Sequence, residues 1–256
     1  MGRFCFDFFY LLVYDFDMPK YIDAHCHIIT PEQMQNAMSC GVGRFVINAT
    51  RPADWSAVTD LANNDNVYGA IGIHPWFVAN LDDDWSGRLI DLLQQNTGLM
   101  VGEIGLDKNH DLFDIQESVF RRGLEIAHDM KRIAHIHCVG TWGKMMDVLR
   151  SVDLPPAMVF HAFSGAAELI PELVQKGAYF SFGLAVCDTK RTKLRESVAV
   201  VPENRILVES DAPDGGMPDT IPETVREIAR IRGVQPEQMA NIIYNNTMGL
   251  LNDKSV

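Results

Sequence analysis

The chain has 256 residues, of which 47% are hydrophobic and 22% charged, and its formal net charge is −12. This composition is typical of a globular protein with one large domain or two modest ones, long enough to bury a sizeable core. The acidic balance argues against a protein that coats nucleic acid, but it does not exclude an enzyme that holds one phosphate through bound cations.

The first 17 residues are rich in aromatic side chains and could be mistaken for a secretion signal. Asp7 and Asp15 interrupt the apolar run, Arg3 is its single basic residue, and no small-residue cleavage site follows. We therefore expect neither a signal peptide nor a membrane span. We expect residues 1–17 to be an extension outside the fold, or an artefact of start-codon choice, and residues 18–256 to form one domain.

Strand and helix patterns alternate along the rest of the chain. The expected strands cover residues 21–28, 44–49, 67–73, 99–106, 133–138, 157–163, 178–183 and 205–210. The expected helices cover residues 31–38, 52–64, 82–95, 114–130, 142–150, 166–176, 189–200, 220–232 and 236–250.

Eight successive strand–helix units without a linker predict a single-domain (β/α)8 TIM barrel, an α/β fold. The competing architecture is a doubly wound open sheet. Such a sheet normally has a glycine-rich phosphate loop after its first strand, where this chain has D-A-H-C-H at residues 23–27. The barrel is therefore the better prediction.

Histidine and carboxylate side chains gather where the expected strands end, which is where a barrel places its active site. His25 and His27 alone form an H-x-H pair on one strand face, which suits either a metal site or two hydrogen-bonded histidines. The other strand ends supply His74, Glu103, His137, His161 and Asp211. The whole set predicts a shared metal centre.

Three neighbours of these residues are not expected to be metal ligands, because of their positions along the strands. His135 lies on the same face as His137 but earlier on the strand, so we expect it deeper in the barrel and satisfied by hydrogen bonds. Cys26 and Cys138 point toward the helices, where they serve as small core residues. The five cysteines are scattered without a C-x-x-C pair, which favours a reducing, cytoplasmic location.

Several motifs follow one another from about residue 20 to Asn246: IDAHCHI, GIHPW, VGEIGLD, Q-x-x-x-F at residues 116–120, IHCVGTWGK, FHAFSG and ESDAP. In this order they resemble the signatures of the TatD-type metal-dependent hydrolases, often described as TatD deoxyribonucleases, within the amidohydrolase superfamily. The resemblance implies a metal-dependent phosphodiesterase fold with two divalent ions. Their identity as Mg²⁺, Mn²⁺ or Zn²⁺ is left open.

The resemblance also implies a role for each residue. It assigns one ion to His25, His27, Glu103 and Asp211, and the other to Glu103, His137 and His161, so that Glu103 bridges the two. Asp211, Glu103 and His74 are the expected catalytic residues. Asp211 would hold the attacking water and accept its proton, and His74 would contact the scissile phosphate or leaving group. The alternative for His74 is to shape the loop before Pro75.

Two carboxylates near the ligands are expected to play supporting roles. Glu209 alternates with Asp211 and is expected to hydrogen-bond a histidine ligand, and Asp23 is expected either to do the same or to satisfy backbone groups. One departure from the family concerns phosphate binding. Many relatives have Arg two residues after the fifth-strand histidine, and this chain has Val139.

Basic and aromatic residues near the rim offer possible substrate contacts. Lys190, Arg191, Lys193 and Arg195 form a basic cluster that either contacts a nucleic-acid backbone or is a solvated helix face. Trp76 or Trp142 could stack a base.

The leading hypothesis is a hydrolase that cleaves single strands or ends of DNA. The alternatives are a small-molecule amidohydrolase or phosphoesterase on the same barrel, and a metal-binding scaffold without catalysis.

Overall fold

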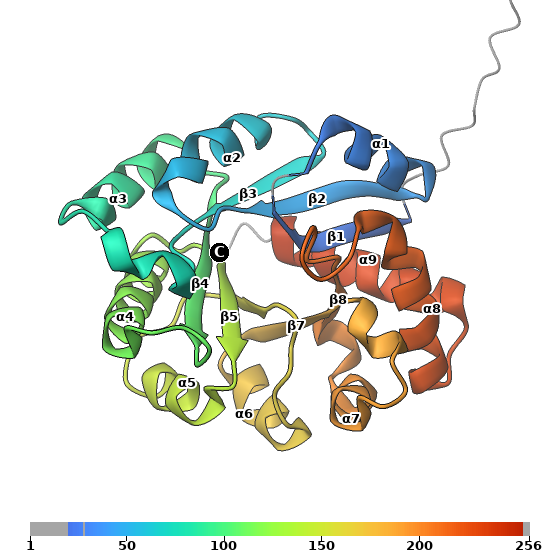
Figure 1. Ribbon diagram of the computed structural model, residues 1–256. Coiled ribbons are helices and arrows are strands. Elements are labelled where there is room, and N and C mark those ends of the chain that lie inside the picture. Colours follow the sequence, from blue (N-terminus) through green and yellow to red (C-terminus); the bar gives the residue numbers. More distant parts are fainter. Residues whose placement is uncertain (1–19, 28, 253–256) are drawn as a thin grey trace, which may run out of the picture.

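The computed structural model describes residues 20–27 and 29–252, and the expected extension at residues 1–17 lies outside the described residues. Eight parallel strands form one sheet in chain order. They are β1 (Tyr21–Cys26), β2 (Val42–Asn48), β3 (Val67–Ile71), β4 (Met100–Asp107), β5 (Ala134–Val139), β6 (Met158–Phe160), β7 (Ala178–Phe182) and β8 (Ile206–Val208). Figure 1 shows these strands surrounded by helices, as the alternating sequence pattern predicts.

The surrounding helices are α1 (Pro31–Ser39), α2 (Trp55–Leu61), α3 (Trp85–Gln95), α4 (Phe113–Asp129), α5 (Trp142–Leu149), α6 (Ile170–Gln175), α7 (Thr192–Val200), α8 (Ile221–Arg232) and α9 (Pro236–Asn252). Short 3-10 turns join some of them: η1 (Pro52–Asp54), η2 (Pro75–Asn80), η3 (Ala167–Leu169), η4 (Leu184–Cys187), η5 (Glu203–Arg205) and η6 (Pro218–Thr220). The (β/α)8 prediction is confirmed.

Some predicted boundaries were wrong. The helices expected over residues 52–64 and 166–176 are each a 3-10 turn followed by a shorter α-helix. Pro171 lies in the first turn of α6, where its missing amide hydrogen removes no helical hydrogen bond. The sixth and eighth strands end at Phe160 and Val208, earlier than expected. The chain leaves the sheet there, and Ala162 and Asp211 have left-handed φ values of 41° and 53°.

The barrel closes between the end of β1 and the segment that follows β8. The Asp211 amide donates to the His25 carbonyl at 3.0 Å, and the His27 amide donates to the Ala212 carbonyl at 2.9 Å. The Asp23 carboxylate accepts hydrogen bonds from the amide and hydroxyl of Ser210 at 2.9 and 2.5 Å. Closure thus fixes the position of Asp211 relative to the histidines of β1.

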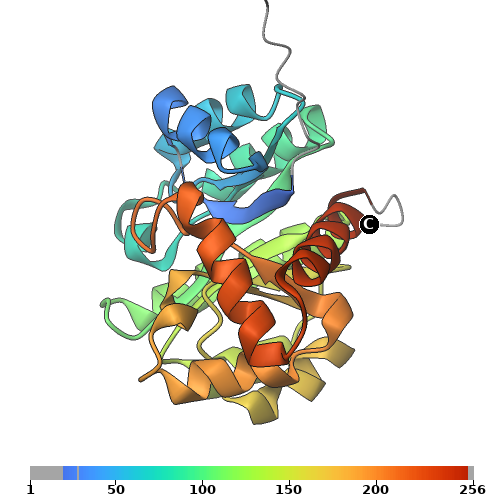
Figure 2. The ribbon, with the colours of Figure 1, turned by 90° about the vertical axis from the view of Figure 1, so that its right-hand side faces the viewer.

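Apolar packing holds the barrel on both sides of its strands. The larger cluster lies between strands and helices and includes Phe120, Phe160 and Phe180. A smaller cluster joins inner-strand residues such as Val46 and Leu207 to Leu250. Leu250 belongs to α9, which packs against β1, β8 and α8 (Figures 1 and 2). The strands are therefore fixed on a packed frame that presents their carboxyl ends to the site.

Candidate metal centre

Glu103 lies at the middle of the site, but not at the end of its strand as expected. β4 continues four residues further to Asp107. Gly105 permits this, because a Cβ at that position would overlap the carbonyl of His137 on β5. The Glu103 side chain is 1% exposed, and its two carboxylate oxygens face two different groups of side chains.

The first group surrounds Oε2 of Glu103. The Nε2 atoms of His25 and His27 lie 3.3 and 3.6 Å from this oxygen. The same two nitrogens lie 3.9 and 3.6 Å from Oδ1 of Asp211. The two imidazole rings are 5.3 Å apart and nearly perpendicular. The H-x-H pair thus converges with both carboxylates, as the sequence predicts.

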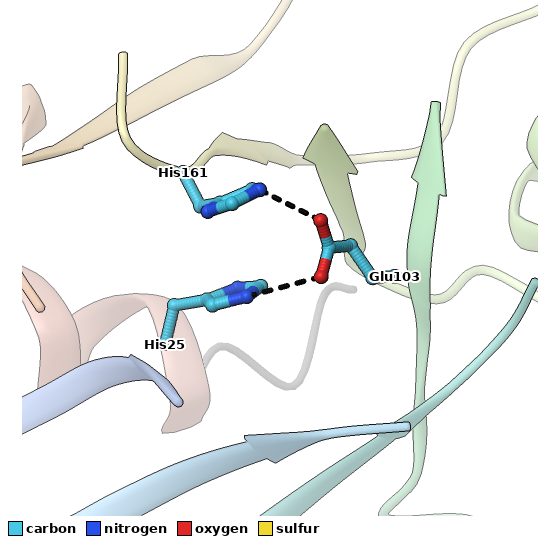
Figure 3. Close-up of side chains that lie close together, drawn as sticks. All are labelled: His25, Glu103 and His161. Atoms are coloured by element: carbon cyan, nitrogen blue, oxygen red, sulfur yellow. Dashed lines mark ion pairs between the residues drawn. The ribbon is translucent and has the colours of Figure 1, made fainter. Parts of the chain in front are cut away.

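The second group surrounds Oε1 of Glu103. His137 Nδ1 and His161 Nε2 lie 2.8 and 2.7 Å from this oxygen. His74 Nε2 lies 3.4 Å from it. Figure 3 shows how His25 and His161, whose rings are stacked at 4.0 Å, each point a nitrogen at a different oxygen of Glu103. One carboxylate therefore joins the two groups.

Outer hydrogen bonds orient two of the imidazoles. Nδ1 of His27 lies 3.0 Å from the Asn48 carbonyl, and Nε2 of His137 lies 3.3 Å from Oδ2 of Asp107. The carbonyl and carboxylate oxygens can only accept hydrogen bonds, so each of these two ring nitrogens must carry the proton. In the neutral ring the other nitrogen then carries a lone pair. In both cases that opposite nitrogen faces the centre.

The residues fit a bound cation. Nδ1 of His137 and Oε1 of Glu103 are lone-pair carriers only 2.8 Å apart, which requires a proton or a metal ion between them. Buried His25 Nε2, Glu103 Oε2 and His161 Nδ1 have no hydrogen-bond partner. Unpaired buried polar atoms are costly, and ligation of a cation removes that cost. Imidazole and carboxylate together are ligands typical of Zn²⁺ and related ions.

His74 is oriented differently from the other histidines. Its Nδ1 accepts a hydrogen bond from the Trp76 amide at 3.2 Å, so the proton of the neutral ring is on Nε2. Burial lowers the pKa of His74 to about 3, which keeps the ring neutral. A protonated Nε2 cannot ligate a metal but can donate a hydrogen bond. In this structure Nε2 of His74 lies 3.2 Å from His137 Nδ1 and 3.4 Å from Glu103 Oε1, and the substrate contact of His74 stays a prediction.

The electrostatics of the centre favour protonated histidines beside Glu103. Against the effect of burial, carboxylate contacts raise the pKa of His27 to about 9 and also raise the pKa values of His137 and His161. Burial raises the pKa of Glu103, but the surrounding histidines outweigh it and bring the pKa well below its ordinary value. Burial lowers the pKa of His161, and the Glu103 carboxylate reverses this and raises it to about 10. Burial lowers the pKa of His25 to about 4. Metal ions at this centre would take over the role of the protons on His27, His137 and His161.

The supporting residues are arranged differently from expectation. Glu209 does not contact a histidine ligand, because its carboxylate accepts hydrogen bonds from the Ser181 hydroxyl and, at 2.5 Å, from the Ala162 amide. Asp23 satisfies backbone and hydroxyl groups at the barrel closure, which was one of its two expected roles. The prediction that His135 is a deeper residue satisfied by hydrogen bonds holds for its burial and for one of its ring nitrogens. It contacts His25 at 3.4 Å, but its Nε2 has no partner.

The cysteines and tryptophans near the centre lie in different surroundings. Cys26 and Cys138 pack in the apolar cluster, as expected. Trp142 packs against Phe160 and Phe163, and its ring nitrogen is buried without a partner. Trp76 instead is 47% exposed. Of the two tryptophans, Trp76 is therefore the one able to offer a face to a ligand.

Asp107 was missed as a site residue by sequence reasoning. Its Oδ2 contacts His137 and also accepts a hydrogen bond from the Trp76 ring nitrogen at 2.8 Å. Burial raises the pKa of Asp107, but contacts with His137 and Trp76 bring it below the ordinary value. The motif VGEIGLD does indicate this residue. Side chains alternate between the two faces of a strand, so Glu103, Gly105 and Asp107 share one face.

The fold and this centre define a barrel hydrolase of the metal-dependent class. The family model for TatD related DNase matches residues 22–252. The chain belongs to this family, as the sequence motifs indicate.

Known relatives agree with this assignment. The metal-dependent hydrolase YjjV of Escherichia coli (strain K12), described as uncharacterized, is 29% identical over 91% of this chain and 98% of its own length. The 3'-5' ssDNA/RNA exonuclease TatD of Citrobacter rodentium (strain ICC168) is 26% identical over 82% of this chain and 86% of its own. The crystal structure of the Escherichia coli YjjV protein has a TM-score of 0.87 at 28% identity, covering 92% of this chain and 99% of that one.

Proposed function

We propose that the protein is a phosphodiesterase that cleaves single strands or ends of DNA by hydrolysis at a centre with two divalent ions. The observation that carries this proposal is the Glu103 carboxylate, whose two oxygens face two separate sets of imidazoles. A shared carboxylate between two ions 3.5–4 Å apart is the arrangement that two-metal phosphodiester hydrolysis uses. The names of relatives such as 3'-5' ssDNA/RNA exonuclease TatD support nucleic acid as the substrate class.

We assign the ligands as the two groups around Glu103. His25, His27, Glu103 and Asp211 would hold one ion, and Glu103, His137 and His161 the other. The bound ions, as Mg²⁺, Mn²⁺ or Zn²⁺, would lower the pKa of the attacking water and offset the charge that develops on the phosphate. Their number and identity are part of this proposal.

The chain's own groups handle the proton and the phosphate. Asp211 is 21% exposed, so its carboxylate can reach a water molecule and accept its proton. With metal ions bound to His137 and Glu103, the Nε2 hydrogen of His74, which faces these two residues, would be donated to an oxygen of the phosphate or leaving group. The half-buried rim thus provides a base on one side of the centre and a donor on the other.

The test uses purified protein that is first stripped of metal and then reloaded with Mg²⁺, Mn²⁺ or Zn²⁺ singly. We expect metal-dependent cleavage of an end-labelled single-stranded oligodeoxynucleotide, and a loss of at least 100-fold in Glu103→Gln because the joint ligand is weakened. Equal cleavage by Glu103→Gln, or none by the loaded wild-type protein, contradicts the proposal.

Hydrolysis of a small amide or phosphoester is the second candidate function. It is favoured by Val139, which lies where many relatives have a phosphate-binding Arg, and by the net charge of −12. A panel of lactones, amides and phosphomonoesters beside oligonucleotides separates the two functions by their kcat/KM values. No helix in the described parts of the chain is long and apolar enough to span a membrane. The cytoplasmic location stays a prediction.

A further inference from the structure

A cavity of about 450 Å³ opens beside the candidate metal centre, between the loops that follow β6, β7 and β8. Its inner wall includes Asp211, Ser210 and Ala162, the residue after His161. Its outer wall is the segment after η4 together with the first turn of α7, including Lys190, Arg191 and Lys193. The cavity therefore extends from a candidate catalytic carboxylate to a group of cations.

These three cations are free to bind a ligand. Their side chains are exposed and have no ion pair or hydrogen bond with other described residues. Arg195, which the sequence placed in the same basic cluster, is different: it pairs with Glu227 and donates to the Val186 carbonyl, both at 2.5 Å. Arg195 therefore anchors α7 against α8, and the cluster available to a ligand is Lys190, Arg191 and Lys193.

The opposite wall does not neutralise these cations. The buried Glu209 carboxylate accepts hydrogen bonds from the Ala162 amide and the Ser181 hydroxyl, and among the described residues it forms no ion pair with the three cations. Asp211 faces the candidate metal ligands His25 and His27. In a chain with a net charge of −12, three unpaired cations at one cavity are an unusual local excess of positive charge.

We propose that this cavity binds a nucleotide unit adjacent to the scissile bond, with Lys190, Arg191 and Lys193 holding its non-scissile phosphate. The inference rests on the proposed function and specifies the substrate as a polyanion with at least one phosphate besides the one that is cleaved. Leu184, Ala185 and Leu194 supply an apolar surface for the sugar or base.

The size and position of the cavity agree with this ligand. Pockets for small ligands range from about 300 to 1,000 Å³, so 450 Å³ suffices for one nucleotide. Lys and Arg bind phosphates through charge-assisted hydrogen bonds. Each such contact with a single strand adds about 0.7 to the slope of log Kd against log salt concentration. Three contacts therefore predict a slope contribution of about 2 in log Kd against log salt.

The experiment compares two variants with equal charge change. In the pocket variant Lys190, Arg191 and Lys193 are replaced by Gln, and in the control variant Arg122, Lys131 and Lys176 are. The control residues lie on α4 or directly after α4 and α6, away from the cavity. Binding of a fluorescent single-stranded oligodeoxynucleotide is measured by anisotropy in EDTA, where no hydrolysis occurs, and KM and kcat are measured with metal.

We expect the pocket variant to raise Kd and KM about tenfold, to leave kcat within about threefold, and to lower the salt slope by about 2. The control variant should change none of these by more than about twofold. Equal effects in both variants overturn the proposal, because they indicate general attraction by net charge. A pocket variant identical to the wild type also overturns it.

A neutral substitution tests the cavity itself. Ala185→Trp adds volume at the exposed wall without a charge change, and we expect it to raise KM for the oligonucleotide several-fold. If Ala185→Trp behaves as the wild type while the pocket variant binds weakly, the cations act on a surface-bound strand and the cavity proposal is wrong. If the wild-type protein cleaves no nucleic acid but binds it as described, only the proposed function fails.

Discussion

Asp107 connects the candidate metal centre to the rim of the barrel. It is almost fully buried, and the same carboxylate oxygen contacts both His137 and Trp76. Partners of this kind fix the orientation and tautomer of a ligating histidine. Asp107 is therefore a positioning residue for His137.

We expect Asp107→Asn to reduce metal affinity and kcat/KM by about 10- to 100-fold, because the amide lacks the charge that supports the His137 tautomer. Metal affinity is measured by titration calorimetry of the stripped protein. Asp114→Asn, an exposed carboxylate in the first turn of α4, is the matched control. Unchanged metal affinity in Asp107→Asn would show that His137 needs no such support.

Trp76 presents an aromatic face at the same rim. Its ring nitrogen is held by Asp107, and its ring stacks on His110 at 4.5 Å. If the substrate is a nucleic acid strand, this fixed and exposed ring is suited to stack a base. Base stacking on an aromatic side chain is worth about 1–3 kcal/mol.

We expect Trp76→Ala to raise KM for a single-stranded oligonucleotide by about tenfold or more, and Trp76→Phe to restore most of the loss. A second substrate series carries abasic sites near the cleaved end. The effect of Trp76→Ala should shrink on the abasic substrate that lacks the stacked base. An equal loss on all substrates would mean that Trp76 acts only through Asp107.

At the scale of the elements, the closure between β1 and β8 determines whether the two halves of the site meet. Asp23 accepts three hydrogen bonds there, from the amides of His25 and Ser210 and from the Ser210 hydroxyl. These contacts hold β1 against the loop that carries Asp211. Burial raises the pKa of Asp23 to about 7, and its side chain is closed off from solvent, so the protein groups around it supply its hydrogen bonds.

We expect Asp23→Ala to lower the free energy of unfolding by about 2–4 kcal/mol, because it leaves buried donors unpaired. Ser210→Ala, which removes only the hydroxyl contact, should cost about 1 kcal/mol. Urea denaturation followed by circular dichroism measures both. A smaller effect for Asp23→Ala than for Ser210→Ala would refute this account of the closure.

For the whole molecule, the centre makes stability depend on bound metal. The buried atoms of His25, Glu103 and His161 that have no hydrogen-bond partner are unfavourable in the metal-free fold. A ligand that binds only the folded state stabilises that state by about 2.7 kcal/mol when its free concentration is 100 times its Kd. For a chain of this size 1 kcal/mol corresponds to about 2–4 °C in Tm.

We therefore expect EDTA to lower the Tm by about 5–10 °C, and added Mn²⁺ or Zn²⁺ to restore it. Differential scanning calorimetry of the wild-type protein and of Glu103→Gln measures the shift. The variant should show a much smaller response to metal. The proposed centre is wrong if the wild-type Tm is the same with EDTA and with each ion.

Much of this molecule follows from its sequence. Alternating strand and helix patterns determine a (β/α)8 barrel, because each apolar strand needs a helix to cover it. Since parallel strands present their carboxyl ends at one face, His25, His27, His137, His161 and Asp211 had to meet there. The order of the motifs also indicates the family.

Only the tertiary structure decided which atoms face one another. The tautomers of His27 and His137 depend on an oxygen of Asn48 and on Asp107, and the cavity beside Asp211 depends on the path of the segment before α7. Arg195 and Lys193 look alike in sequence, yet one is paired with Glu227 and the other is free. Local pattern determines which elements form, whereas hydrogen-bond direction and side-chain pairing depend on residues distant in the chain and emerge only when the barrel closes.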